Sequence, residues 1–277
     1  MYRVSKVLNN NGVIAIDMDE NQEYVILGKG VGFGKKVSQR FDKPEECTMY
    51  RLAQETERGS AKELVKGIEP EYLEISDAIL TEAQKVFGES IDRGILFPLA
   101  DHISFAVARI RRNEQISNPL TEDIKALFYS EFKVAETLKT ILKERLQIEI
   151  DDHEVGYVAL HIHSAIGDEK VSVAMQTARA VRECIDMIEK ATGKPIDVLS
   201  LSYNRLMNHM KYMVARASTG EKLNLDMNEY MLDQYPQAYE IAADICKNLE
   251  GGIGHKLDET EIGYLAMHIQ RVYKDAV

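Results

Sequence analysis

The sequence lacks the features that mark membrane, secreted and disulfide-stabilised proteins. No apolar run approaches the roughly eighteen residues of a membrane span, and the N-terminal residues lack the long apolar segment of a signal peptide. The three cysteines, Cys47, Cys184 and Cys246, are scattered and show no CxxC spacing. This distribution argues against a disulfide framework or a structural zinc site, and for reduced thiols. We therefore expect a soluble cytoplasmic protein with no metal and no membrane insertion.

The sequence also lacks the short motifs of common enzyme classes. It contains no nucleophile elbow, no Walker P-loop and no zinc-binding HExxH. Residues 28–33 contain GxGxG, but not a GxGxxG that leads into a helix, so a dinucleotide-binding fold is not indicated. We expect no catalytic residues, no cofactor and no enzymatic activity.

Positive charge is scarce overall and unevenly distributed. The 277 residues carry a net charge of -11, which argues against general nucleic-acid binding. Residues 1–58 are neutral, with nine Lys and Arg against nine Asp and Glu, so the rest of the chain carries the whole negative charge. Residues 29–43 contain five Lys and Arg and a single acidic residue, Asp42. Any contact with a polyanion should therefore involve this segment.

The N-terminal residues are typical of short antiparallel strands. The apolar runs 13–16 and 24–27 are separated by the polar segment 17–21, and residues 9–12 are a further turn signal. In residues 28–34, glycines alternate with a lysine, a valine and a phenylalanine. Aromatic rings stack on RNA bases and lysines reach phosphates, although a tight hairpin has a similar composition. A module this small buries little core, so we expect it to dimerise.

Beyond about residue 60 the spacing of apolar residues becomes helical, and the region contains an internal repeat. The segment 152–162 (DHEVGYVALHI) matches the segment 259–269 (ETEIGYLAMHI), which is an offset of 107 (259 minus 152). The same offset places His102 on His209 and His161 on His268 without a gap. We therefore predict two homologous helical domains, each with a pair of histidines at a spacing of 59 (161 minus 102).

Duplication of a histidine pair at one spacing favours a chemical function over simple packing in a helical core. A histidine titrates near neutral pH, and a neutral ring nitrogen is nucleophilic. Phosphorylation would add a charge of about -2, which can rearrange an interface. A metal site around His161 and His163 is a competing hypothesis. It is disfavoured because helical residues two apart point in different directions, and because Gln270 replaces His163 in the second repeat.

These motifs together resemble one protein family over essentially the whole chain. The matching segments, in order, are residues 6–11 (KVLNNN), 28–33 (GKGVGF) with Lys35 and Lys36, Asp101-His102, 154–162 (EVGYVALHI), 205–209 (RLMNH) and 264–269 (YLAMHI). In this combination and order, they are similar to the bacterial transcriptional antiterminators of the bgl/sac type.

The resemblance implies a multidomain protein. A small antiparallel β-sheet domain, the co-antiterminator RNA-binding domain, would span residues 1–58. Two homologous all-α helical-bundle regulation domains would follow at residues 66–170 and 172–277. In this family the sheet has four strands and acts as a homodimer, which grips an RNA hairpin in nascent messenger RNA. The hairpin then excludes an overlapping terminator, so transcription continues.

The resemblance also implies partners and site residues. The regulation domains would sense sugar through histidine phosphorylation by the phosphocarrier HPr and a sugar-specific permease (enzyme II) of the phosphotransferase system. The permease acts negatively, typically through the first domain, and HPr acts positively through the second in many members. By position, the phosphoacceptors would be His102, His161, His209 and His268. The RNA-contact stretches would include Lys6, Asn10, Asn11, Gly28, Lys29, Gly30 and Phe33.

This sequence departs from the family pattern at two positions of the RNA-contact segment. Lys29 stands where many members have arginine, and Gly34 where many have glutamine. Lysine keeps the charge but lacks the bidentate geometry of arginine, which puts the family's RNA preference in doubt here.

Two alternative functions are weighed against this one. A DNA-binding activator can carry the same regulation domains, but it would need a helix-turn-helix, and residues 1–58 have the pattern of strands. A metal-dependent hydrolase would depend on His161 and His163, which the helical spacing disfavours.

Overall fold

The computed structural model describes the chain except for residues 53–54, 57–58, 89–90, 115, 168–169, 194, 198–199 and 276–277. The expected domain ends at residues 58 and 277 lie outside the described residues. The chain divides into two compact units, which we describe separately. Unit 1 comprises Met1–Asn118 and Ser130–Val171, and unit 2 comprises Pro119–Tyr129 and Ser172–Val277.

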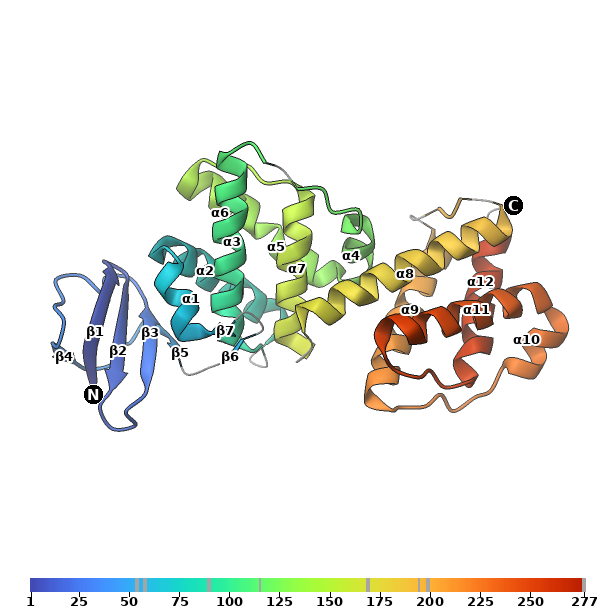
Figure 1. The fold of residues 1–277 in the computed structure, drawn as a ribbon, viewed down its shortest axis with the longest axis horizontal. Helices are drawn as coiled ribbons and strands as arrows, with labels where there is room; N and C mark the ends of the chain where they lie inside the picture. Colours follow the sequence, from blue (N-terminus) through green and yellow to red (C-terminus); the bar gives the residue numbers. More distant parts are fainter. Residues whose placement is uncertain are drawn as a thin grey trace. The chain divides into compact units, whose positions relative to one another are not determined.

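Unit 1 begins with an antiparallel sheet (Figure 1). Its strands are β1 (Tyr2–Asn9), β2 (Gly12–Asp17), β3 (Glu23–Leu27), β4 (Arg40–Phe41) and β5 (Thr48–Arg51), in the spatial order β4-β1-β2-β3-β5. The strands and turns predicted in residues 9–27 are confirmed. The sheet has five strands rather than the four implied by the family resemblance, because the short β4 pairs with the start of β1. A separate ladder of β6 (Glu55–Thr56) and β7 (Gly59–Ser60) follows.

Successive side chains along a strand point to opposite faces, and buried apolar residues occur on both faces of this sheet. On one face, Val13, Ala15 and Ile26 form a small core that half-buried side chains cover. On the other face, the buried ring of Tyr50 in β5 packs edge-on against Phe97 of the helical region, with ring centroids 6.3 Å apart. The sheet therefore packs on the helices of unit 1 through one face.

Helices make up the rest of both units. Those of unit 1 are α1 (Ala61–Gly67), α2 (Pro70–Phe87), the short 3-10 helix η1 (Arg93–Ile95), α3 (Leu96–Arg111), α5 (Tyr129–Ala135), α6 (Thr137–Leu146) and α7 (Asp152–Gly167). Those of unit 2 are α4 (Thr121–Leu127), α8 (Val171–Thr192), α9 (Leu201–Thr219), α10 (Asn228–Gln234), α11 (Pro236–Ile253) and α12 (Thr260–Asp275). The predicted fold class, a small sheet followed by helical domains, is confirmed.

The helix boundaries reproduce the repeat seen in the sequence. Helices α4 and α10 begin and end at positions related by the same offset of 107. At that offset, α11 covers the same span as α5 and α6 together, which are interrupted at Glu136. The segment Pro119–Tyr129, which contains α4, nevertheless groups with unit 2, where α4 contacts α9.

A polar network ties the sheet to α2 within unit 1. The hydroxyl of Tyr50 donates a hydrogen bond to Asp77 of α2. Arg93 of η1 donates to both the Tyr50 oxygen and Asp77, each at 2.8 Å. Burial raises the pKa of Tyr50, so the hydroxyl stays protonated and keeps its role as donor. The network fixes the position of β5 relative to α2.

The close approach of two turns leaves no room for a side chain at Gly32. A Cβ atom there would lie 2.0 Å from the carbonyl oxygen of Asn9 and 2.9 Å from that of Gly12. Both oxygens belong to the backbone of paired strands, so they cannot move away without disturbing the strand pairing. We expect Gly32→Ala to lower the free energy of unfolding of the sheet by at least roughly 1–3 kcal/mol. Hydrogen exchange of the β1–β3 amides measures this loss.

Gly67→Ala is the matched control, because nothing lies within 4 Å of the Cβ position at Gly67. It should leave exchange in the sheet unchanged. Equal protection in the two variants would contradict the steric argument.

Candidate functional site

Two turns at one end of the sheet bring most of the predicted RNA-contact residues together. The β1–β2 turn lies against the loop that follows β3. The amide of Gly28 donates to the carbonyl of Asn11 at 2.9 Å, and the amide of Gly32 donates to the carbonyl of Asn10 at 3.0 Å. The amide of Gly30 donates to the side-chain oxygen of Asn11 at 3.1 Å. We call residues 9–11 and 28–33 the turn cluster.

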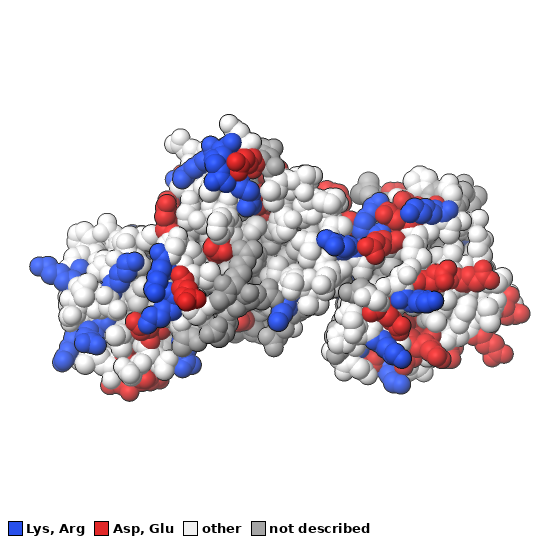
Figure 2. Space-filling model, viewed as in Figure 1, with Lys and Arg blue, Asp and Glu red and all other residues white. Residues whose placement is uncertain are grey.

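The turn cluster presents an aromatic ring and positive charge to solvent. Phe33 is 74% exposed, so it is not a core residue, and Lys29, in the same loop, is also exposed. Gly30 has a φ of +72°, a conformation that glycine adopts without strain. Lys6 is also exposed, but it lies on β1 rather than in either turn. Figure 2 shows Lys and Arg exposed over the N-terminal sheet and abundant Asp and Glu over unit 2.

A carboxylate from α2 reaches the turn cluster. The side-chain amide of Asn9 donates to Glu74 at 2.7 Å, and that of Asn11 donates to its second oxygen at 3.2 Å. Arg145 of α6 lies 3.6 Å from the same carboxylate. Glu74 therefore places a negative charge beside groups predicted to face RNA. No local sequence pattern indicates this contact, because its partners lie in distant parts of the chain.

Each predicted histidine pair comes together as two rings in contact. His102 of α3 and His161 of α7 have ring centroids 5.5 Å apart. His209 of α9 and His268 of α12 have centroids 4.8 Å apart, with the rings nearly parallel at 25°. The two histidines that share a constant spacing in the sequence thus form one site in each repeat.

Next to the first histidine of each pair lies a buried glutamate carboxylate, which forms an ion pair with an arginine. In unit 1, Glu154 accepts from Arg109 at 2.8 Å, and its other oxygen lies 3.4 Å from Nε2 of His102. In unit 2, Glu261 accepts from Arg216 at 2.6 and 2.9 Å and lies 3.6 Å from Nε2 of His209.

Helical periodicity explains why these residues meet. Each arginine follows the first histidine of its pair by seven residues, and each glutamate precedes the second histidine by seven. Two helical turns separate residues seven apart, so both members point from one face. Glu154 and Glu261 belong to the repeated sequence motif, but the arginines were not predicted. The offset of 107, which relates Arg109 to Arg216, could have revealed them.

The rings of the second pair are neutral at physiological pH. Burial lowers the pKa of His209 to about 3, with further contributions from His268 and Arg216. Burial also lowers the pKa of His268 to about 4, helped by the charges of Arg271 and Arg205. Neutral imidazole has a free nitrogen lone pair, so these rings are available as nucleophiles.

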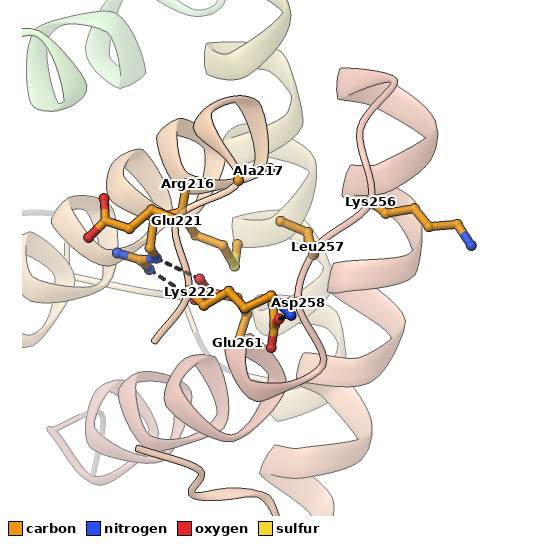
Figure 3. Close-up of a pocket in the computed structure, with 10 residues that line it drawn as sticks. Arg216, Ala217, Glu221, Lys222, Lys256, Leu257, Asp258 and Glu261 are labelled. Atoms are coloured by element: carbon orange, nitrogen blue, oxygen red, sulfur yellow. Dashed lines mark hydrogen bonds and ion pairs between the residues drawn. The ribbon is translucent and has the colours of Figure 1, made fainter. Parts of the chain in front are cut away.

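A cavity next to the carboxylate distinguishes the two repeats. In unit 2, Arg216 and Glu261 help to line a cavity of about 180 Å³, in which their side chains face one another (Figure 3). The corresponding space in unit 1, beside Glu154, is only about 10 Å³. Ile110 lines it where the repeat places the smaller Ala217 in unit 2. The histidine pair and its glutamate are thus shared by the two repeats, and their surroundings differ.

The proposed metal ligands face different neighbours, as the helical spacing predicts. Nδ1 of His163 lies 2.9 Å from Glu131 of α5, whereas His161 packs on His102. Among the described residues, no group of three or more His, Cys, Asp or Glu is placed to hold a metal ion. In the same part of the chain, no helix is long and apolar enough to cross a membrane.

Comparison with known proteins identifies this combination of domains. Residues 2–59 match the CAT RNA binding domain, and residues 77–165 and 182–272 each match the PRD domain. The chain belongs to the CAT–PRD family of transcription antiterminators. We refer below to its CAT domain and to its first and second PRD.

Relatives of this family match the chain from end to end. It is 30% identical to the GlcA/glcB genes antiterminator of Staphylococcus carnosus, over 97% of this chain and 94% of that protein. It is 28% identical to the transcription antiterminator LicT of Bacillus subtilis, over 99% of this chain and 100% of LicT.

A solved structure supports the same assignment. The crystal structure of GlcT CAT-PRDI matches with a TM-score of 0.52 and 30% identity, over 60% of this chain and 98% of that one. The predicted family and the predicted function as an RNA-binding antiterminator are confirmed. A DNA-binding activator is not supported, because the CAT sheet occupies the region where a helix-turn-helix would be required.

Removing the charge of Glu74 should strengthen RNA binding. The carboxylate holds the side chains of Asn9 and Asn11 and repels phosphates that approach the turn cluster. We expect Glu74→Gln to tighten hairpin binding by roughly 0.5–1 kcal/mol, the scale of a partly exposed charge contact. Titration of the full chain with labelled hairpin RNA measures the change.

Glu71→Gln, one turn earlier on α2, is the control and should bind as the unmodified chain does. Weaker binding by Glu74→Gln would show instead that this carboxylate orients the asparagines for RNA.

Acidification should destabilise the second PRD through its histidines. The ordinary pKa of about 6.5 applies in the unfolded chain, whereas the pKa values of His209 and His268 are about 3 and about 4 in the folded domain. Between these values the unfolded chain binds more protons, so the free energy of unfolding falls as pH decreases from about 6.5 to about 4. Urea unfolding followed by circular dichroism measures this slope.

The double variant His209→Asn, His268→Asn should show a shallower slope. His255→Asn changes an exposed histidine and should leave the slope as it is. Identical slopes in the double variant and the unmodified chain would rule out this origin of the pH dependence.

Proposed function

We propose that the CAT domain, at residues 1–58, binds a hairpin in nascent messenger RNA through Lys6, Asn10, Asn11, Gly28, Lys29, Gly30 and Phe33. The observation that supports this most is the hydrogen-bonded turn cluster, which exposes Phe33 and Lys29 together. An exposed aromatic ring can stack on an unpaired base, and lysine can contact phosphate. Holding the hairpin excludes the overlapping terminator.

The regulation domains, at residues 66–170 and 172–277, would receive phosphoryl groups at His102, His161, His209 and His268. HPr and a sugar-specific permease would be the donors. The pairing of neutral, nucleophilic rings in the second PRD supports this role. Each transfer would add a charge of about -2 at the histidine pair. The chain would act as a regulator in the cytoplasm, with no catalytic residues and no cofactor of its own.

The two PRDs differ in what surrounds the second histidine. In the second PRD, Arg205 and Arg271 lie close enough for their charges to lower the pKa of His268. The repeat places Pro98 and Ser164 at the equivalent positions of the first PRD. Phosphate and guanidinium form strong charge-assisted hydrogen bonds. A phosphoryl group on His268 would therefore be stabilised by two arginines that the first repeat replaces, so the two domains would respond in opposite directions.

A homodimer would place the acceptor histidines at an interface. Phe105 and Tyr212 are equivalent in the repeat, lie one helical turn after His102 and His209, and are 57% and 61% exposed. Exposed aromatic rings of this size are typical of protein contact surfaces. The half-buried residues over the core of the sheet offer a second contact surface.

The test is transcription through the terminator in vitro with the full chain. His102→Asp or His161→Asp, which mimic phosphorylation, should reduce read-through, and His209→Asp or His268→Asp should raise it. Adding Arg205→Ala and Arg271→Ala should abolish the gain from His268→Asp. Unchanged read-through in all four histidine variants would return these residues to a packing role.

The same assay tests the RNA contact. Phe33→Ala should reduce read-through, because a lost stacking contact weakens binding by about 1–3 kcal/mol. Val86→Ala is the control, since Val86 is an apolar residue on α2, outside residues 29–43, that is 59% exposed. Equal effects of the two variants would argue against stacking on Phe33.

A further inference from the structure

The two histidines of each PRD bury opposite ring nitrogens. In the first PRD, the buried atoms are Nε2 of His102 and Nδ1 of His161. In the second PRD, they are Nε2 of His209 and Nδ1 of His268. The two repeats have diverged in their surroundings, as the differing cavities show, yet the same ring nitrogen is buried at each pair of equivalent histidines.

The buried Nε2 of the first histidine faces the buried glutamate. The separations are 3.4 Å between His102 and Glu154 and 3.6 Å between His209 and Glu261. Burial opposes ionisation of Glu154, but its contacts with His102 and Arg109 hold the pKa of the carboxyl below its ordinary value. The carboxylate is therefore charged at neutral pH.

A charged carboxylate decides which tautomer the neighbouring ring adopts. A nitrogen lone pair aimed at an anionic oxygen would be repelled, whereas an N–H aimed at it is attracted. When the ring is neutral, its proton therefore resides on Nε2 and its lone pair on Nδ1. The side chains of His102 and His209 keep 9% and 8% of their surface exposed, and none of that surface belongs to Nε2.

The second histidine of each pair presents the other nitrogen. Nδ1 of His161 and of His268 is buried, so a donor protein would have to approach the second histidine of each pair from the Nε2 side. In the second PRD, the arginines that act on the His268 ring are exposed, Arg205 on α9 and Arg271 on α12. Both guanidinium groups are therefore available to bind a phosphoryl group that is transferred to His268.

We propose that each PRD carries two chemically different phosphohistidines. The phosphoryl group bonds to Nδ1 at His102 and His209, and to Nε2 at His161 and His268. Glu154 and Glu261 are positioning residues that select Nδ1 at the first histidine by holding the proton on Nε2. This inference rests on the proposed function, since it assigns the bonding atom at the proposed acceptors.

The transfer at the first histidine balances without a further reactant. The Nδ1 lone pair attacks phosphorus, the N–P bond forms, and the donor's bond to phosphorus breaks with its electron pair left on the donor atom. The ring proton stays on Nε2, where the adjacent carboxylate compensates the positive charge that develops on the ring. At the second histidine the Nε2 lone pair attacks, and the proton remains on the buried Nδ1.

The experiment identifies the isomer at each acceptor. The full chain is incubated with phosphoenolpyruvate, enzyme I and HPr, or with the phosphorylated permease, and analysed by 31P NMR and with antibodies specific for each phosphohistidine isomer. Four variants each retain one acceptor, with the other three changed to alanine. We expect the Nδ1 isomer at His102 and His209, and the Nε2 isomer at His161 and His268.

The possible outcomes distinguish a failure of this inference from a failure of the proposed function. The same isomer at both histidines of a pair would overturn the inference and leave the proposed function standing. Absence of phosphate from all four histidines with either donor would overturn both.

A second measurement tests the positioning role of the glutamate. In Glu261→Gln the amide can donate to Nε2 and move the ring proton to Nδ1. We expect phosphorylation of His209 to slow by roughly 10-fold or more, as when a partner that fixes a histidine tautomer is lost, while the rate at His268 is unchanged. Glu261→Asp keeps the charge and should keep the Nδ1 isomer.

Glu259→Gln changes an exposed residue two positions earlier and serves as the control. An unchanged rate and isomer at His209 in Glu261→Gln would overturn the positioning role. If that variant does not fold, the isomers measured in the single-acceptor proteins still decide the main proposal.

Discussion

A carboxylate removed from water must be given a cation and hydrogen bonds, or it loses its charge. Glu154 and Glu261 are 4% and 1% exposed, and in each PRD the cation is an arginine on the neighbouring helix. The ion pair fixes how α3 meets α7 and how α9 meets α12, because each helix supplies one partner. It also sets the position of the charge that the first histidine faces. The ring contact and the tautomer both follow from this constraint.

The two PRDs share this centre and differ around it. Arg205 and Arg271 flank the second pair, and the first pair has Pro98 and Ser164 at those positions. Ile110 fills space beside Glu154, whereas the smaller Ala217 occupies the equivalent position near Glu261. This difference leaves room for the cavity of unit 2. Duplication therefore preserved the histidine pair with its glutamate and arginine, and divergence changed the charges and the space around them. Under the proposed function, the same phosphorylation event would then have opposite regulatory effects in the two PRDs.

Features with a local pattern were predictable from the sequence. The strands β2 and β3, the turn at Asn10 and the two helical repeats follow from alternation, turn residues and the offset of 107. Strand β4 was not predictable, because two residues carry no periodicity and are ordered by pairing with β1. The contact of Glu74 depends on tertiary packing, and the facing direction of each imidazole depends on side-chain rotamers. Neither leaves a trace in residue spacing.

Helix α2 belongs to the CAT domain as much as to the first PRD. Glu74 meets the turn cluster, and Asp77, one turn later, holds Tyr50 of the sheet. An engineer who joined this CAT domain to another regulator by cutting at residue 59 would discard both contacts. The chimera would keep the turn cluster but lose helix α2, which contacts that cluster through Glu74. Arg93 and Phe97 also contact Tyr50, so a fragment that keeps all of these contacts extends at least through Phe97, well beyond the boundary of the sheet.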